Sequence, residues 1–196
     1  MNTVRSAVAL TSLLASFTAQ AGVIEVLPGG GRSTIYFYEP VGQSFTAEDE
    51  RIKFAFHFAS LNPSAVNTPL TFSLVSGAGL GGTTLATQSF SLATGFSGYY
   101  DIDLSSTQLI AGQIYTAFVS TERTSAHWAV SFNSNDVYAG GQAYSSSNTP
   151  ADWAFRVTPT DLVGEVPEPG SVALMVFGLA ALRFARRTPT GPGASA

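Results

Sequence analysis

The sequence of 196 residues is long enough for one domain with a sizeable core, and its lack of cysteine excludes disulfide bonds and thiol chemistry. The formal net charge is −4, but four of the nine basic residues lie near the two ends of the chain. Residues 22–165 hold five basic and twelve acidic side chains, a formal charge of −7 that would repel a phosphate backbone and argues against nucleic-acid binding.

The first residues have the three parts of a secretory signal peptide. Arg5 supplies a positive charge, residues 6–17 form a short apolar run, and small residues stand at Ala19 and Ala21. Such a run is too short to span a bilayer alone, and the small residues fit a cleavage site. We predict a signal helix over residues 1–21 that is removed after Ala21, in preference to a buried N-terminal helix.

Residues 22–165 are dominated by short segments in which apolar side chains recur at every second position. The clearest is residues 51–58, where this spacing gives one apolar and one more polar face. The apolar faces of the successive segments are defined by Ile52, Phe54, Phe56 and Phe58, by Leu70, Phe72 and Leu74, by Tyr100, Ile102 and Leu104, by Ile114, Thr116 and Phe118, by Trp128, Val130 and Phe132, and by Trp153, Phe155 and Val157. Each segment is predicted to be a half-buried β-strand.

Clusters of glycine, proline, asparagine and serine separate these segments. Because each strand has one apolar face, two sheets must bury those faces against each other, which predicts an all-β fold, an antiparallel β-sandwich over residues 22–165 without an amphipathic helix. The glycine-rich residues 77–82 resemble a dinucleotide-binding string, but strand-like residues follow where that motif needs a helix. We therefore interpret them as a hairpin loop.

The C-terminal part contains a Pro-Glu-Pro spacer, an uncharged apolar run over residues 172–182 and a basic cluster. The motif residues are Pro167, Glu168, Pro169, Arg183, Arg186 and Arg187. This order resembles the PEP-CTERM sorting signal of exported bacterial proteins, which implies recognition and cleavage by an exosortase. The resemblance implies a sorting signal over residues 166–187 with a short transmembrane helix. Residues 188–196 depart from it, because they are longer than the few residues that usually follow the arginines, and we expect them to be a disordered tail. Eleven apolar residues suit a transient anchor better than a permanent span, and the arginines would hold the C-terminus in the cytoplasm.

Four segments of the body resemble jelly-roll-like, surface-anchored bacterial domains. They are residues 41–47 (VGQSFTA), 111–115 (AGQIY), 138–144 (YAGGQAY) and 152–157 (DWAFRV). The resemblance implies an architecture but no activity, because such folds serve sugar-binding, adhesive and purely structural proteins.

Catalytic groups are sparse in the sequence. His57 and His127 lie seventy residues apart, and Ser97 lacks the spacing of a nucleophile elbow. A hydrolase would need one of the histidines within hydrogen-bond reach of a carboxylate in a pocket. We expect both histidines to be solvated strand residues and the protein to be no enzyme.

Two groups of oxygen-bearing side chains could bind a hard cation. Asn133, Asn135 and Asp136 alternate in a loop and could hold a structural calcium ion, although asparagine and aspartate also form turns by bonding their own backbone. Asp101 and Asp103 are expected to point the same way from one strand. They could form a cation site or an acid and base pair, or they could be part of an acidic stripe on the surface. No other cofactor is expected.

Tyrosine side chains provide the sharpest hypothesis about a ligand. Tyr36 and Tyr38 are expected to share one face of a strand, and Tyr99 to lie beside Asp101 and Asp103. Such rings can stack on a sugar while carboxylates bind its hydroxyls. The sequence thus indicates an exported surface or extracellular-matrix protein of unknown biochemical activity. It would use the secretion machinery and an exosortase, and would pass the inner membrane before reaching the outer envelope or the extracellular space. The alternative is a carbohydrate-binding module of the same fold, with surface polysaccharide as its partner.

Overall fold

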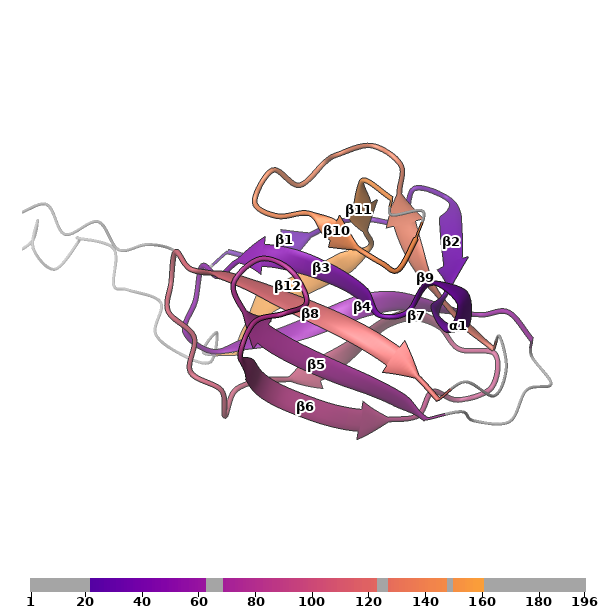
Figure 1. Cartoon of the computed structure of the whole chain (residues 1–196), viewed down its shortest axis with the longest axis horizontal. Coiled ribbons are helices and arrows are strands. Elements are labelled where there is room, and N and C mark those ends of the chain that lie inside the picture. The colour runs from indigo at the N-terminus through magenta and orange to yellow at the C-terminus, as the bar shows by residue number, and fades with distance from the viewer. Residues whose placement is uncertain (1–21, 63–68, 123–126, 148–149, 161–196) are drawn as a thin grey trace, which may run out of the picture. The chain divides into compact units, whose positions relative to one another are not determined.

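The computed structural model describes residues 22–62, 69–122, 127–147 and 150–160 (Figure 1). The predicted signal helix and the C-terminal transmembrane helix lie outside these residues. The elements are β1 (Ile24–Glu25), β2 (Gly31–Thr34), α1 (Ile35–Tyr38), β3 (Val41–Thr46), β4 (Ile52–Ser60), β5 (Leu70–Ser76), β6 (Thr84–Phe90), β7 (Ser97–Asp103), β8 (Ile114–Thr121), β9 (Trp128–Asn133), β10 (Ala143–Tyr144), β11 (Asp152–Trp153) and β12 (Phe155–Pro159). In the described ranges no helix has the length and apolar character needed to cross a membrane.

The strands form two antiparallel sheets, which confirms the predicted all-β fold. Sheet A follows the order β1-β12-β4-β9-β11, with β2 paired to β9 and β7 paired to β4. Sheet B follows the order β10-β3-β8-β5-β6. Side chains from both sheets share one hydrophobic core whose members all lie within residues 24–157. The β domain therefore contains its own complete core.

Strand β4 supplies the centre of this core. Its side chains at Ile52, Phe54, Phe56 and Phe58 are buried, as the alternation predicts. Ala55 on the opposite face is also only 1% exposed, so the strand is more than half-buried. The reason is that Arg156 on β12 and Asp101 on β7 flank Ala55 in register and form an ion pair of 2.9 Å across its small side chain.

The face of strand β8 that packs against the core is not the one that the sequence pattern predicted. The buried core side chains are Tyr115, Ala117 and Val119. Ile114 is exposed, and Thr116 uses its hydroxyl to donate a hydrogen bond to the Gly77 carbonyl oxygen at 2.8 Å. Because both faces of β8 carry apolar residues, the alternation alone did not define which one faces the core.

Residues 35–38 form one helical turn, α1, where the sequence predicted a strand and no helix. The turn is attached at both sides: Ser146 donates its backbone N–H to the Tyr38 carbonyl oxygen at 3.0 Å, and Thr121 donates its N–H to the Glu39 carboxylate at 2.8 Å. Tyr36 and Tyr38 therefore do not share a face in the way that alternate residues of a strand do.

The two ends of the β domain lie at the same end of the sandwich. Ile24 pairs with Val157, and Pro159 pairs with Ile52 at the start of β4. Helix α1 lies at the other end, because β3 begins beside it and runs back toward the loop that leads into β4 (Figure 1). Pro159, the last residue of β12, thus lies at the end opposite α1.

Candidate functional site

A buried carboxylate lies where three separate segments meet. Asp152 begins β11 and has no exposed surface. Its Oδ2 accepts hydrogen bonds from the backbone N–H of Val137 at 2.9 Å and of Tyr138 at 3.0 Å, and its Oδ1 accepts one from Gln43 Nε2 at 3.2 Å. Burial raises the pKa of the Asp152 carboxyl above its ordinary value, although these hydrogen bonds oppose the shift. We call Asp152 and its partners the Asp152 network.

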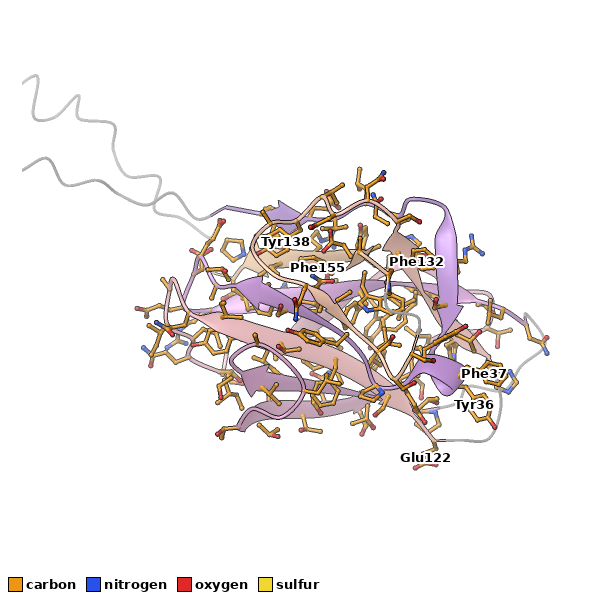
Figure 2. The ribbon with its side chains drawn as sticks, turned by 45° about the horizontal axis from the view of Figure 1, so that its top comes forward. Tyr36, Phe37, Glu122, Phe132, Tyr138 and Phe155 are labelled. Atoms are coloured by element: carbon orange, nitrogen blue, oxygen red, sulfur yellow. The ribbon has the colours of Figure 1, made fainter. Side chains whose placement is uncertain are left out.

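Gln43 extends the Asp152 network into sheet B. Its Oε1 accepts the backbone N–H of Trp153 at 3.0 Å, while its Nε2 also donates to the Ser44 carbonyl oxygen at 3.3 Å. Three positions after Gln43, Thr46 donates its backbone N–H to the Tyr138 hydroxyl at 3.1 Å. The ring of Tyr138 in turn packs on Phe155, 5.2 Å between centroids (Figure 2).

These contacts show what three of the four segments that resemble surface-anchored domains do in the fold. Residues 41–47, 138–144 and 152–157 are brought together, and their polar side chains satisfy one another. A buried polar group that lacks partners is costly, so this network supports the fold and leaves little polar capacity for a ligand. Sequence analysis missed Asp152. The available signal was an aspartate that directly precedes a fully apolar run in a strand.

Tyr99, one of the predicted sugar-binding residues, lies on the outer face of sheet A. Its hydroxyl donates to the Val26 carbonyl oxygen at 2.9 Å, and the guanidinium carbon of Arg156 lies 4.9 Å from its ring centroid. Burial, and to a smaller extent the nearby Glu25 carboxylate, raises the pKa of Tyr99 to about 12. The ring is thus held between strands, with its hydroxyl already used by the protein.

His57 lies beside Tyr99 on the same face. The two rings meet edge to face with centroids 5.1 Å apart, and His57 Nδ1 lies 2.9 Å from the Ser131 hydroxyl. Burial lowers the pKa of His57, which favours the neutral imidazole. Ser131 is only 2% exposed, so this serine and histidine pair could not present its hydroxyl to a substrate.

The tip formed by α1 presents aromatic side chains to solvent. Phe37 is 65% exposed, and its ring contacts that of Tyr36 edge to face with centroids 4.9 Å apart. Tyr38 is half-buried and packs against the core. Figure 2 shows Tyr36 and Phe37 at the end of the domain that also carries Glu122. We call Tyr36, Phe37 and Tyr38 the aromatic tip.

The structure divides the three predicted sugar-binding tyrosines between two places. Tyr36 and Tyr38 belong to the aromatic tip, which packs against β2, β8 and β9, whereas Tyr99 is bound to the segment after β1. Phe37, which sequence analysis did not include among the ligand-binding rings, is the most exposed ring of the tip. The run of three consecutive aromatic residues was the signal that could have identified it.

The predicted calcium ligands lie at the end of β9 and in the turn that follows. Asn133 Oδ1 accepts the backbone N–H of Asn135 at 3.0 Å, and Asn133 Nδ2 donates to the Leu27 carbonyl oxygen at 3.5 Å. This is the backbone-bonded turn that sequence analysis kept as the alternative. Within the described ranges no three His, Cys, Asp or Glu residues are grouped so that they could hold a metal ion. A calcium site at Asn133, Asn135 and Asp136 stays a prediction.

Two open pockets lie at the end of the domain opposite the aromatic tip, with volumes of about 340 and 470 Å³. They share Ala78 and Ile114, and are otherwise lined by glycines and short or amide side chains, together with Ile110, Tyr115 and Tyr144. Neither of these two pockets is lined by a histidine or a carboxylate, so neither offers the arrangement that a hydrolase needs. Residues 77–82 form the β5–β6 hairpin loop at their edge, as predicted.

The sorting residues Pro167, Glu168, Pro169, Arg183, Arg186 and Arg187, and the cleavage-site residues Ala19 and Ala21, lie outside the described residues. Comparison with protein families nevertheless identifies the tail: residues 165–187 match the family model of the PEP-CTERM protein-sorting motif. Fold and motif together define an exported protein with an antiparallel β domain ahead of a sorting signal. The chain thus carries a PEP-CTERM sorting motif, which implies an exosortase as its processing partner and sorting to the cell surface.

Other comparisons add little to this assignment. No curated protein matches the chain. Among solved structures, the infectious bursal disease virus VP2 subviral particle is similar with 16% identity and a TM-score of 0.21. That match covers 85% of this chain, and the chain spans 46% of the viral one.

Proposed function

We propose that the β domain is a non-catalytic module that the sorting motif delivers to the outer envelope or the extracellular matrix. The observation that carries this proposal is the PEP-CTERM motif, which begins at residue 165, shortly after the last core strand ends at Pro159. The burial of Ser131 beside His57 and the use of Asp152 within the fold support a domain without catalytic groups.

Replacing Glu168 by Gln is expected to lower tail removal in the native host by about tenfold or more, because a site built for a charged group rejects its neutral isostere. Intact-mass analysis would show the normal protein beginning at Gly22 and ending near Glu168, and the variant retaining residues 172–196. Asp161→Asn, outside the motif, serves as the control. A host without the exosortase should reproduce the Glu168→Gln result. Normal processing in that host would contradict the proposal.

We further propose that the aromatic tip contacts carbohydrate. Its support is the 65% exposure of Phe37 beside the Tyr36 ring, on a turn fixed by Ser146 and Thr121. Exposed rings on a fixed backbone can stack on a sugar without much loss of conformational entropy. Tyr99 has no part in this contact, since its hydroxyl and ring are engaged on sheet A.

Phe37→Ala is expected to weaken binding to an array of bacterial and plant polysaccharides by about tenfold, the loss of roughly 1.4 kcal/mol of stacking. Ile110→Ala is the matched control, because Ile110 is also 65% exposed but lies at the other end of the domain. Both variants should unfold at the same temperature as the parent chain. Equal binding by the two variants, or no binding by the parent, would reject the carbohydrate contact while leaving the sorting assignment untouched.

A further inference from the structure

A long stretch of the sequence carries no formal charge. Residues 54–100 contain no Asp, Glu, Lys or Arg, although residues 22–165 as a whole have a formal charge of −7. Described parts of this stretch supply β5, β6 and most of β4. One margin of sheet B is therefore free of charged side chains.

Strand β6 is the margin of sheet B in this uncharged region. Among the described residues it pairs with β5 alone, through the register Leu70↔Phe90 to Val75↔Thr84. Most of its side chains are exposed, including Leu85 at 39%. Its other edge therefore presents backbone N–H and C=O groups that a further strand could pair with.

The remaining sheet margins in the described residues differ from β6. Strand β7 carries Asp101 and Asp103, β2 carries Arg32, and β1 carries Glu25. Strands β10 and β11 have only two residues each. Proteins protect sheet edges from pairing with charged side chains, prolines and short strands. Strand β6 has seven residues, and none of them is charged or a proline.

The geometry of β6 also suits pairing. It is held by β5 along its length, and the Ser73 and Thr87 hydroxyls lie 3.5 Å apart on the outer face. The single irregularity of the ladder is near Leu74 and Val75, so residues 86–90 form a regular edge. A strand fixed in this way loses little further entropy when a second strand binds.

We propose that β6 binds β6 of a second copy of this chain, antiparallel across a two-fold axis, and so joins two sheets B into one continuous sheet. A second copy is the partner because it presents the same long, uncharged edge. Two β domains, each with a formal charge of −7 over residues 22–165, repel each other, and β6 is the extended edge at which they can approach without opposing like charges. A two-fold pairing needs only one self-complementary surface, and antiparallel pairing of one strand with itself provides it.

The absence of cysteine allows a direct test on the full chain. Single variants at Leu85, Ala86, Thr87, Gln88 and Ser89, each changed to Cys, sample every register of a two-fold pairing around the middle of β6. At least one is expected to form a disulfide-linked dimer under mild oxidation about tenfold faster than Ser97→Cys, an exposed residue on the charged edge strand β7. Linkage requires Cα atoms about 4.4–6.8 Å apart, so the fastest position also reports the register.

A second variant distinguishes strand pairing from random collision. Thr87→Lys, added to the fastest-linking Cys variant, or Ser89→Lys if position 87 itself links fastest, places two like charges across the paired edges and should reduce dimer formation to the Ser97→Cys rate. Its unfolding temperature should match that of the parent, because these positions are exposed. Linking at the Ser97→Cys rate by every β6 variant, linking insensitive to the lysine, or linkage of β6 to a protein of another mass would each overturn the proposal.

Discussion

Asp152→Ala is expected to lower the free energy of unfolding by about 3 kcal/mol, because it leaves three hydrogen-bond donors without an acceptor around a site with no solvent access. These donors are the N–H groups of Val137 and Tyr138 and the Gln43 amide. Urea titration of the full chain measures the loss. Asp101→Ala is the control: its ion pair with Arg156 is solvent-exposed and worth at most about 1 kcal/mol. Equal losses in the two variants would contradict the role assigned to the Asp152 network.

The Asp152 carboxyl should also leave a signature in the pH dependence of stability. Its pKa is raised in the folded chain above the ordinary value of 3.8. The folded state then binds more protons than the unfolded state between these two pKa values, so the contribution of Asp152 to stability falls as pH rises through that window. In Asp152→Asn this titration is absent. The stability of the parent relative to Asp152→Asn should therefore be highest below about pH 3.8 and become constant above the raised pKa.

Phe54→Ala is expected to destabilise the domain by about 3–5 kcal/mol, the cost of removing a large ring from a packed core. Phe54 touches four other rings, with centroid separations of 5.4 Å to Phe45, 4.9 Å to Phe56, 5.8 Å to Phe72 and 5.7 Å to Phe155. These come from both sheets, so the cavity would lie between the sheets. Urea titration again provides the measurement.

Phe37→Ala is the matched control for Phe54→Ala, since the same side chain is removed from an exposed position. Its free energy of unfolding should change by no more than about 0.5 kcal/mol. A comparable loss in both variants would mean that the aromatic tip is part of the core. In that case its exposed ring could not be assigned to a ligand.

Much of the fold could be predicted because most strands have only one apolar face. The alternation at residues 52–58 and at Trp153, Phe155 and Val157 identified buried faces that the structure confirms. At β8 the same method chose the wrong face, since Ile114 and Phe118 are as apolar as Ala117 and Val119 and only the partner strands decide between them. The helical turn α1 escaped prediction because four residues are too few to show a helical period.

The candidate sites were less predictable, because they depend on contacts between segments far apart in the sequence. Gln43 and Asp152 are separated by 109 positions, and neither residue alone indicates that it is buried. Tyr99 was correctly placed on an outward face, yet its bond to Val26 comes from a strand pairing that no local pattern reveals. The sorting motif could be identified from sequence alone because its signal is contiguous.

The position of β12 makes folding of the β domain depend on the end of its sequence. Among the described residues it is the last strand, yet it lies within sheet A between β1 and β4. The core therefore cannot close until the whole of residues 24–157 is available. Twelve residues then separate Pro159 from Val172, a reach of at most roughly 40 Å when extended. The β domain can therefore complete its core without any residue of the sorting motif at residues 165–187, so folding and tail removal need not compete.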